Sequence, residues 1–103
     1  MTAAGSQPSE LEAVRLRRQQ SDRCYYCDTD LRGGGELDHK VSVQRCGKNA
    51  IENRAWACRT CNRDKVDKNV VEFIQWRVDH GLSVRQAIPE MAVAVSEGLG
   101  KKT

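Results

Sequence analysis

The sequence has little of the material from which a large core is built. Only five of its 103 residues are aromatic, two are proline, and apolar types make up 39% of the chain. No run of about 18 apolar residues occurs, and the first 20 residues lack the apolar stretch of a signal peptide. We therefore expect one small intracellular, cytoplasmic protein with a thin core and no membrane partner.

Neither sign of charge dominates the chain. Lysine and arginine number 17 against 14 acidic residues, a net charge of +3, which argues against a highly charged disordered chain. A small domain with a thin core usually needs a disulfide or a structural metal. Because five cysteines are an odd number and short cysteine spacings in a reducing compartment favour metal, we expect a metal site.

Four of the cysteines form two C-x-x-C pairs. Cys24 and Cys27 are separated by 30 residues from Cys58 and Cys61. Zinc takes four thiolates at about 2.3 Å, and a two-residue spacer lets both sulfurs of a pair reach one ion. A redox role is the alternative, but no thioredoxin-like βαβ pattern accompanies the pairs. We predict a structural Zn²⁺ and interpret Cys46 as a small loop side chain without a role.

The N-terminal fifth of the chain divides into two parts. Residues 1–8 show no apolar periodicity and are predicted to be a disordered leader. Ser9 and Glu12 have the S-x-x-E form of a capping box, which predicts a helix over residues 10–20 with Leu11 and Val14 on its apolar side. The arginines of this helix form either a solvated face or a surface along a phosphate backbone.

The segment between the cysteine pairs predicts a strand, a loop, a second strand and a helix. Three glycines at 33–35 mark a turn, and alternation over residues 37–43 is typical of a strand. A polar loop over 44–49 follows. Residues 55–57 are interpreted as the second strand and 62–68 as the helix.

The C-terminal third has helical periodicity. Val70, Val71, Ile74 and Val78, with Phe73 and Trp76, predict a core-packing helix that ends near Gly81, where His80 is a helix-end residue. A last apolar stripe over 84–95 is interrupted by Pro89, which predicts two short helices or a kink before Gly98. These patterns divide the chain into a domain over 9–80 with its central finger at 22–68, and a helical tail over 81–103.

Three further positions complete a pattern with the cysteines. Asp38-His39 lies on the first predicted strand, Asn53 precedes the second, and Cys61 is followed by Asn62-x-x-Lys65. Together with the two C-x-x-C pairs, these residues resemble an HNH endonuclease of the zinc-knuckle type over residues 24–68. The resemblance implies an α+β fold, the ββα-metal finger stapled by a four-cysteine zinc site, here with flanking N- and C-terminal helices.

The resemblance also implies a hydrolytic mechanism. His39 would take a proton from water as general base, a role for which the imidazole group is suited at neutral pH. Asp38 points to the opposite strand face and, with Asn62, would supply oxygen ligands to Mg²⁺ or Mn²⁺. Asn53 would hold the loop and orient the histidine ring. The expected substrate is DNA, which a metal-dependent endonuclease would nick or cut through both strands.

Basic side chains near the second cysteine pair are candidates for phosphate contacts: Arg59, Arg63, Lys65 and Lys68. The chain departs from the family where Ser42, Cys46-Gly47, Arg54 and Val66 stand in place of the usual proline, paired glycines, leucine and glycine.

The resemblance is compatible with a role in restriction, homing, phage packaging or repair, for a protein encoded by a phage or mobile element. Such a protein would act as a homodimer or in a larger nuclease assembly. The alternative is a non-catalytic zinc module that binds nucleic acid or protein.

Overall fold

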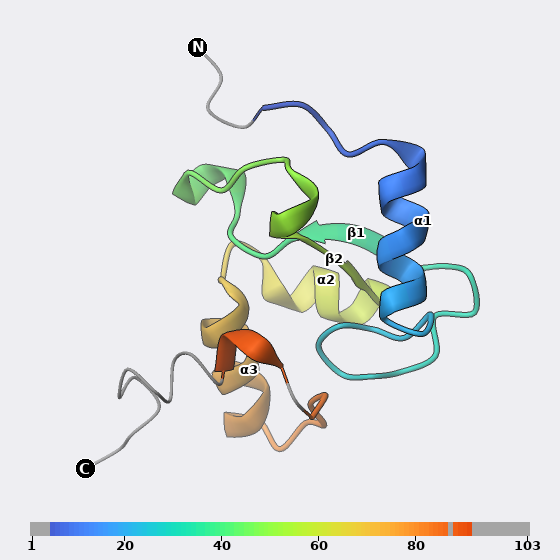
Figure 1. The fold of residues 1–103 in the computed structure, drawn as a ribbon. Helices are drawn as coiled ribbons and strands as arrows, with labels where there is room; N and C mark the ends of the chain where they lie inside the picture. The colour runs from blue at the N-terminus through green and yellow to red at the C-terminus, as the bar shows by residue number, and fades with distance from the viewer. Residues whose placement is uncertain (1–4, 87, 92–103) are drawn as a thin grey trace.

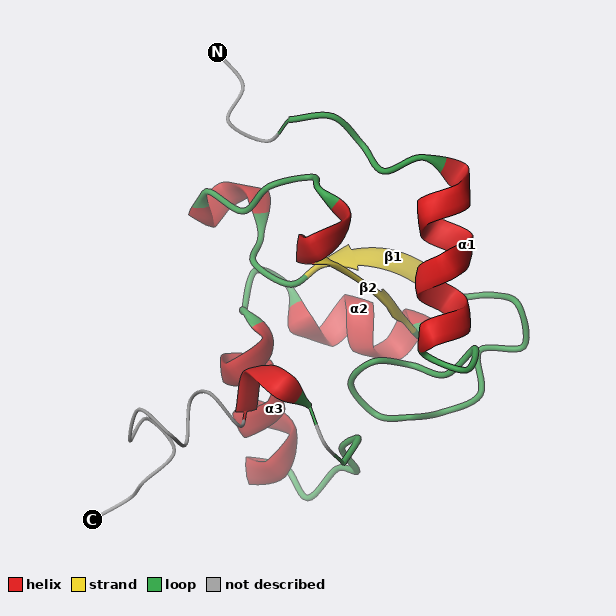
Figure 2. Ribbon diagram, in the orientation of Figure 1, coloured by secondary structure: helices red, strands yellow, loops and turns green. Residues whose placement is uncertain are grey.

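Two short antiparallel strands lie at the centre of the computed structural model, which describes residues 5–86 and 88–91. Strand β1 spans Glu36–His39 and pairs with β2, Arg54–Ala57, so that Glu36 lies opposite Ala57 and His39 opposite Arg54. Helices pack around this pair (Figures 1 and 2). The fold is the expected small α+β arrangement, two antiparallel strands followed by a helix, with flanking helices on both sides.

The strand pair separates two sides of the molecule. Side chains alternate along β1, so Glu36 and Asp38 face one side and Leu37 and His39 the other. Helix α2, Arg59–Lys65, lies on the Asp38 side. It begins three residues earlier than predicted, because the Cys58 sulfur accepts from the Cys61 amide and caps its first turn.

The predicted strand over residues 37–43 is wrong beyond His39. The chain bends there and continues through two 3-10 turns, Val43–Arg45 and Ile51–Asn53. The side chains of Val41 and Val43 are exposed, so their alternation does not mark a buried face. The loop closes so tightly that a Cβ on Gly47 would lie 1.8 Å from the Val41 carbonyl oxygen, and only glycine fits.

Helix α1, Glu10–Gln19, begins as predicted, with both hydrogen bonds of the Ser9–Glu12 capping box formed. Its apolar stripe does not reach the core, however, since the residues Leu11 and Val14 are 57% and 44% exposed. The helix is instead held by the Trp56 indole, which donates to the Ala13 carbonyl at 2.8 Å. A polar contact therefore fixes the helix where the periodicity predicted apolar packing.

Helix α3, Val70–Asp79, closes the core with Val70, Phe73 and Ile74. The Phe73 ring meets Tyr26 edge-on at 5.2 Å between centroids. Val78, predicted to be core, is exposed. No helix in the described residues is long and apolar enough to span a bilayer.

The segment after α3 differs from the prediction. Residues 82–85 are not helical, and helical structure resumes at Pro89, where a missing N–H costs nothing. The buried Ile88 side chain just before it packs on the core. Val95 of the predicted stripe, and Gly98 after it, lie outside the described residues.

Candidate functional site

The four cysteines of the C-x-x-C pairs form one cluster. Their Sγ atoms all lie within 4.8 Å of one another, and the Cys27 and Cys58 sulfurs are 3.8 Å apart. A tetrahedral ion with bonds of about 2.3 Å would separate its sulfur ligands by about 3.8 Å. All four thiols are free. The donor set therefore fits zinc, and it is the one such cluster in residues 5–86 and 88–91.

Hydrogen-bond donors surround the sulfurs. The backbone N–H of Tyr26 donates to Cys24 Sγ, and Nη1 of the buried Arg77 donates to Cys61 Sγ, both at 3.4 Å. Hydrogen bonds from Cys27 and Cys61 lower the pKa of Cys24, while hydrogen bonds with Cys24 and Cys27, together with burial, raise the pKa of Cys61. Arg77 was not predicted; its cation, carried by α3, offsets the negative charge that four thiolates bring to a metal centre.

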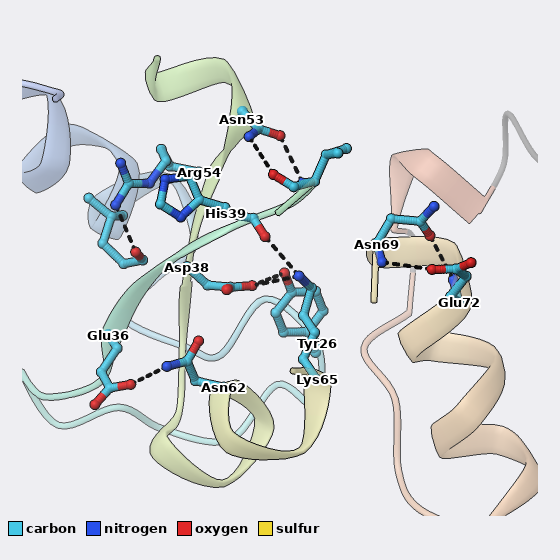
Figure 3. Close-up of polar contacts among 12 residues, drawn as sticks. Tyr26, Glu36, Asp38, His39, Asn53, Arg54, Asn62, Lys65, Asn69 and Glu72 are labelled. Carbon is cyan, nitrogen blue, oxygen red and sulfur yellow. Dashed lines mark hydrogen bonds and ion pairs between the residues drawn. The ribbon is translucent and has the colours of Figure 1, made fainter. Parts of the chain in front are cut away.

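Asp38 is fixed on the α2 side of the strands. Its Oδ2 accepts from the Tyr26 hydroxyl at 2.6 Å and lies 3.2 Å from Lys65 Nζ (Figure 3). Lys65 also donates to the His39 carbonyl at 2.7 Å. Because the Lys65 side chain is 1% exposed, its ammonium does not reach a phosphate as the sequence suggested; it holds β1 against α2.

Asn62 lies one helical turn before Lys65 and faces the same strand. Its Nδ2 donates to Oε1 of Glu36, two residues before Asp38 on the same face of β1. The structure thus places the Asn62 amide of α2 against the face of β1 that carries the Glu36 and Asp38 carboxylates. Glu36 was missed by the sequence reasoning, although its two-residue spacing from Asp38 was a usable signal.

His39 faces away from Asp38, toward the long loop. Its Nε2 lies 2.8 Å from Asn49 Oδ1, and Asn49 Nδ2 donates to the Gly5 carbonyl at 2.8 Å. Since the amide nitrogen donates to Gly5, the amide oxygen faces the ring and accepts a hydrogen bond from Nε2–H of His39. This assignment leaves Nδ1 as the nitrogen able to accept a proton.

The Asn53 side chain forms hydrogen bonds with the loop after β1 and not with the His39 ring. Its Nδ2 donates to the carbonyls of Val41 and Lys48, at 2.9 and 2.7 Å, and its Oδ1 accepts from the Val41 amide at 2.9 Å. The side chain bonded to His39 is Asn49, which the sequence reasoning did not single out. Nothing in the local sequence marked Asn49, because its role depends on how the loop folds back.

The remaining basic side chains predicted to contact phosphates differ in their exposure and in their contacts within the protein. Arg59 is exposed on α2, and the Arg63 side chain is 72% exposed with Nε 3.2 Å from Asp64. The Lys68 ammonium lies 5.4 Å from the Trp76 ring centroid. Two arginines and one lysine therefore remain at the surface near α2.

The comparison with known protein families matches residues 24–68 to the HNH endonuclease family. No curated protein and no solved structure matches the chain. The matched range holds both cysteine pairs, Asp38, His39 and Asn62. Residues 24–68 are an HNH endonuclease domain. The family implies a phosphodiester hydrolase and a nucleic-acid substrate.

Proposed function

We propose that the protein is a metal-dependent endonuclease that hydrolyses phosphodiester bonds in DNA. The observation that supports this best is the position of its groups at the end of β1. There the imidazole of His39, oriented by Asn49, lies on one face and the carboxylate of Asp38 on the other, while Asn62 lies further back on the Asp38 face, bonded to Glu36 at the start of the strand. A phosphodiester placed at the strand end would meet a base on one side and hard oxygen ligands on the other.

In this proposal His39 Nδ1 takes the proton from the attacking water. Asn49 keeps the Nε2 proton in place and fixes the ring direction during transfer. Both contacts of Asp38 fall on Oδ2, which leaves Oδ1 for a cation, together with Oδ1 of Asn62. When bound there, Mg²⁺ or Mn²⁺ would supply charge stabilisation for the phosphate and its leaving 3′ oxygen.

We assign the zinc cluster a structural role. Four cysteine ligands complete a tetrahedron and leave no position for water or substrate. The cluster joins the loop of Cys24 and Cys27 to the start of α2, the helix that carries Asn62. Zinc would thus set the position of one ligand of the proposed catalytic cation without taking part in the reaction.

DNA contacts are assigned to the surface near α2. Arg59, Arg63 and Lys68 would bind backbone phosphates, which gives affinity without sequence preference. One protomer has one such centre and would cut one strand at a time. Double-strand cleavage would therefore need a homodimer or a larger assembly.

The test is conversion of supercoiled plasmid by the zinc-loaded protein with added Mg²⁺ or Mn²⁺. We expect nicking by the wild type and its loss in His39→Ala. His80→Ala is the matched control, because His80 is exposed at the end of α3 and stacks on Trp76. Cleavage by neither wild type nor control, with DNA binding retained, would favour the non-catalytic zinc module. Equal cleavage by wild type and His39→Ala would remove His39 as the base.

A further inference from the structure

Arg54 is a buried cation without a matching anion. The residue is 6% exposed and forms no ion pair within the described residues. Its guanidinium donates only to neutral oxygens, at 2.9 Å to Gln7 Oε1 and Leu37 O and at 3.2 Å to Asn49 O. Its Nε is buried with no partner among the described atoms. Burying a charge in this way is costly unless something compensates for it.

The position of Arg54 ties it to the proposed catalytic base. It lies directly opposite His39 in the strand pair, so both side chains project from the same face. Asn49 contacts both of them, with its amide oxygen on His39 and its carbonyl on Arg54. The acid whose charge acts on Arg54, Asp38, is on the other face, and burial lowers the pKa of the guanidinium.

A groove runs beside this cluster, between α1 and the strand pair. It has a volume of about 380 Å³, and its lining includes Lys40, the residue after His39. Three cations line it, Arg15, Lys40 and Arg54, against Glu12 and Glu52. The Glu12 carboxylate is engaged in the cap of α1, and Lys40 also lies 3.2 Å from Glu90. With Glu90 counted, three carboxylates face the three cations, so the feature that favours an anionic ligand is Arg54, whose guanidinium has no anion bonded to it among the described residues.

We propose that Arg54, with Arg15 and Lys40, binds a DNA backbone phosphate in this groove, next to the phosphodiester at His39. The proposal rests on the proposed function, since it takes DNA as the ligand. Gln7, exposed and outside the match to the family, places its side-chain oxygen on Arg54 Nη1. A phosphate oxygen would replace that neutral oxygen, and the guanidinium would then bind it with a charge-assisted hydrogen bond.

The experiment measures binding, not cleavage. Fluorescence anisotropy of a labelled DNA duplex is followed without an added divalent ion, over a series of salt concentrations. Arg54→Leu is expected to bind about tenfold more weakly and to lower the slope of log affinity against log salt by about one. Arg18→Gln is the matched control, because Arg18 is exposed on α1 outside the groove lining. It removes the same charge and is expected to weaken binding by less.

Gln7→Ala tests the proposal from the other side, because it removes the side-chain oxygen that accepts a hydrogen bond from Arg54 Nη1 and competes with a phosphate for that group. Unchanged or tighter DNA binding supports the proposal. Wild-type affinity and salt slope in Arg54→Leu, or an equal loss in Arg18→Gln, would overturn it. Zinc content and the melting temperature establish that each variant is folded. If Arg54→Leu is not folded, the double variant Arg15→Gln, Lys40→Gln takes its place, with the same expected loss and the same overturning results.

The two proposals fail separately. A wild type that never cuts but loses affinity on Arg54→Leu would retain the phosphate subsite and remove the nuclease. A wild type that cuts, with Arg54→Leu binding normally, would retain the nuclease and remove the subsite.

Discussion

The two faces of β1 are built on opposite principles. On the α2 face, the charged and polar side chains are paired with one another. Asp38 forms an ion pair with Lys65 and accepts a hydrogen bond from Tyr26, and Asn62 donates a hydrogen bond to Glu36. On the α1 face, His39 and Arg54 contact only neutral oxygens, beside an open groove. The α2 face pairs its buried charges within the protein and leaves Asp38 Oδ1 for the proposed cation, whereas the α1 face holds the Arg54 guanidinium with no anion bonded to it among the described residues.

The contrast indicates where stability and binding reside. The α2 face adjoins the zinc cluster and the aromatic core of Tyr26 and Phe73, so its groups are fixed before any substrate arrives. On the α1 face, neutral oxygens of Gly5 and Gln7 contact Asn49 and Arg54, and the phosphate proposed above would replace the Gln7 oxygen. Changes to the paired groups of the α2 face should therefore alter folding as well as the proposed cation site, and changes on the α1 face should alter binding and rate with less effect on folding.

The largest effect should come from the cysteine cluster. Cys61→Ser, or complete removal of zinc, is expected to unfold the region from Cys24 to Cys61, since binding energy of about 10–16 kcal/mol for structural zinc is also folding energy. Circular dichroism, thermal melting and zinc content measure this. Cys46→Ser is the control, because Cys46 is exposed and outside the cluster. An unchanged melting curve after zinc loss would refute the structural role.

A smaller effect is expected for Lys65→Met. Its ammonium is the buried partner of Asp38, with side chains 1% and 11% exposed, and removing one partner of such a pair costs about 3–5 kcal/mol. Chemical denaturation measures the loss. The double variant Lys65→Met, Asp38→Asn should recover part of it, because no carboxylate is then left unpaired. A single variant as stable as the wild type would show that the two faces do not differ in this way.

Local sequence signals predicted the parts of this fold that depend on neighbours in the chain. Ser9 and Glu12 lie three residues apart, so the cap of α1 could be read directly. The same holds for the two C-x-x-C pairs, whose spacing alone indicates metal chelation. Their convergence across 30 residues follows once both are assigned to one ion.

Contacts between distant segments could not be read in this way. Its position among basic side chains near the second cysteine pair predicted a phosphate contact for Lys65, yet the Lys65 side chain is buried beside Asp38 of β1. Asn49 and Arg54 gain their roles only when the loop folds back over β1. Tertiary pairing of polar groups leaves no periodic signal, so these residues looked like ordinary loop and strand positions.

On the α1 face, Asn49→Ala should slow plasmid cleavage by about 10–100-fold, the usual cost of losing a group that orients another. The reason is that His39 Nε2 loses its acceptor and the ring is free to turn. Melting temperature should change little compared with Lys65→Met. Recovery of the rate in Asn49→Asp, which keeps an acceptor oxygen, would support orientation; equal rates in all three proteins would exclude it.

The smallest effect is invisible at neutral pH and concerns the chain's two tyrosines, Tyr25 and Tyr26. Burial raises the pKa of both hydroxyls, and hydrogen bonds to Glu90 and Asp38 raise it further. The stability this gives is fully present below the unfolded pKa of about 10 and is lost as the pH rises through the folded values.

Tyrosinate absorbance should therefore stay absent just above pH 10 in the folded protein and appear together with unfolding. The chain in concentrated guanidinium chloride, titrating near its ordinary pKa of about 10, is the control. If the absorbance rose at that pH while the circular dichroism stayed native, Tyr26 would not be sealed against Asp38. The α2 face would then be as open to solvent as the α1 face, and the contrast between the two would fail.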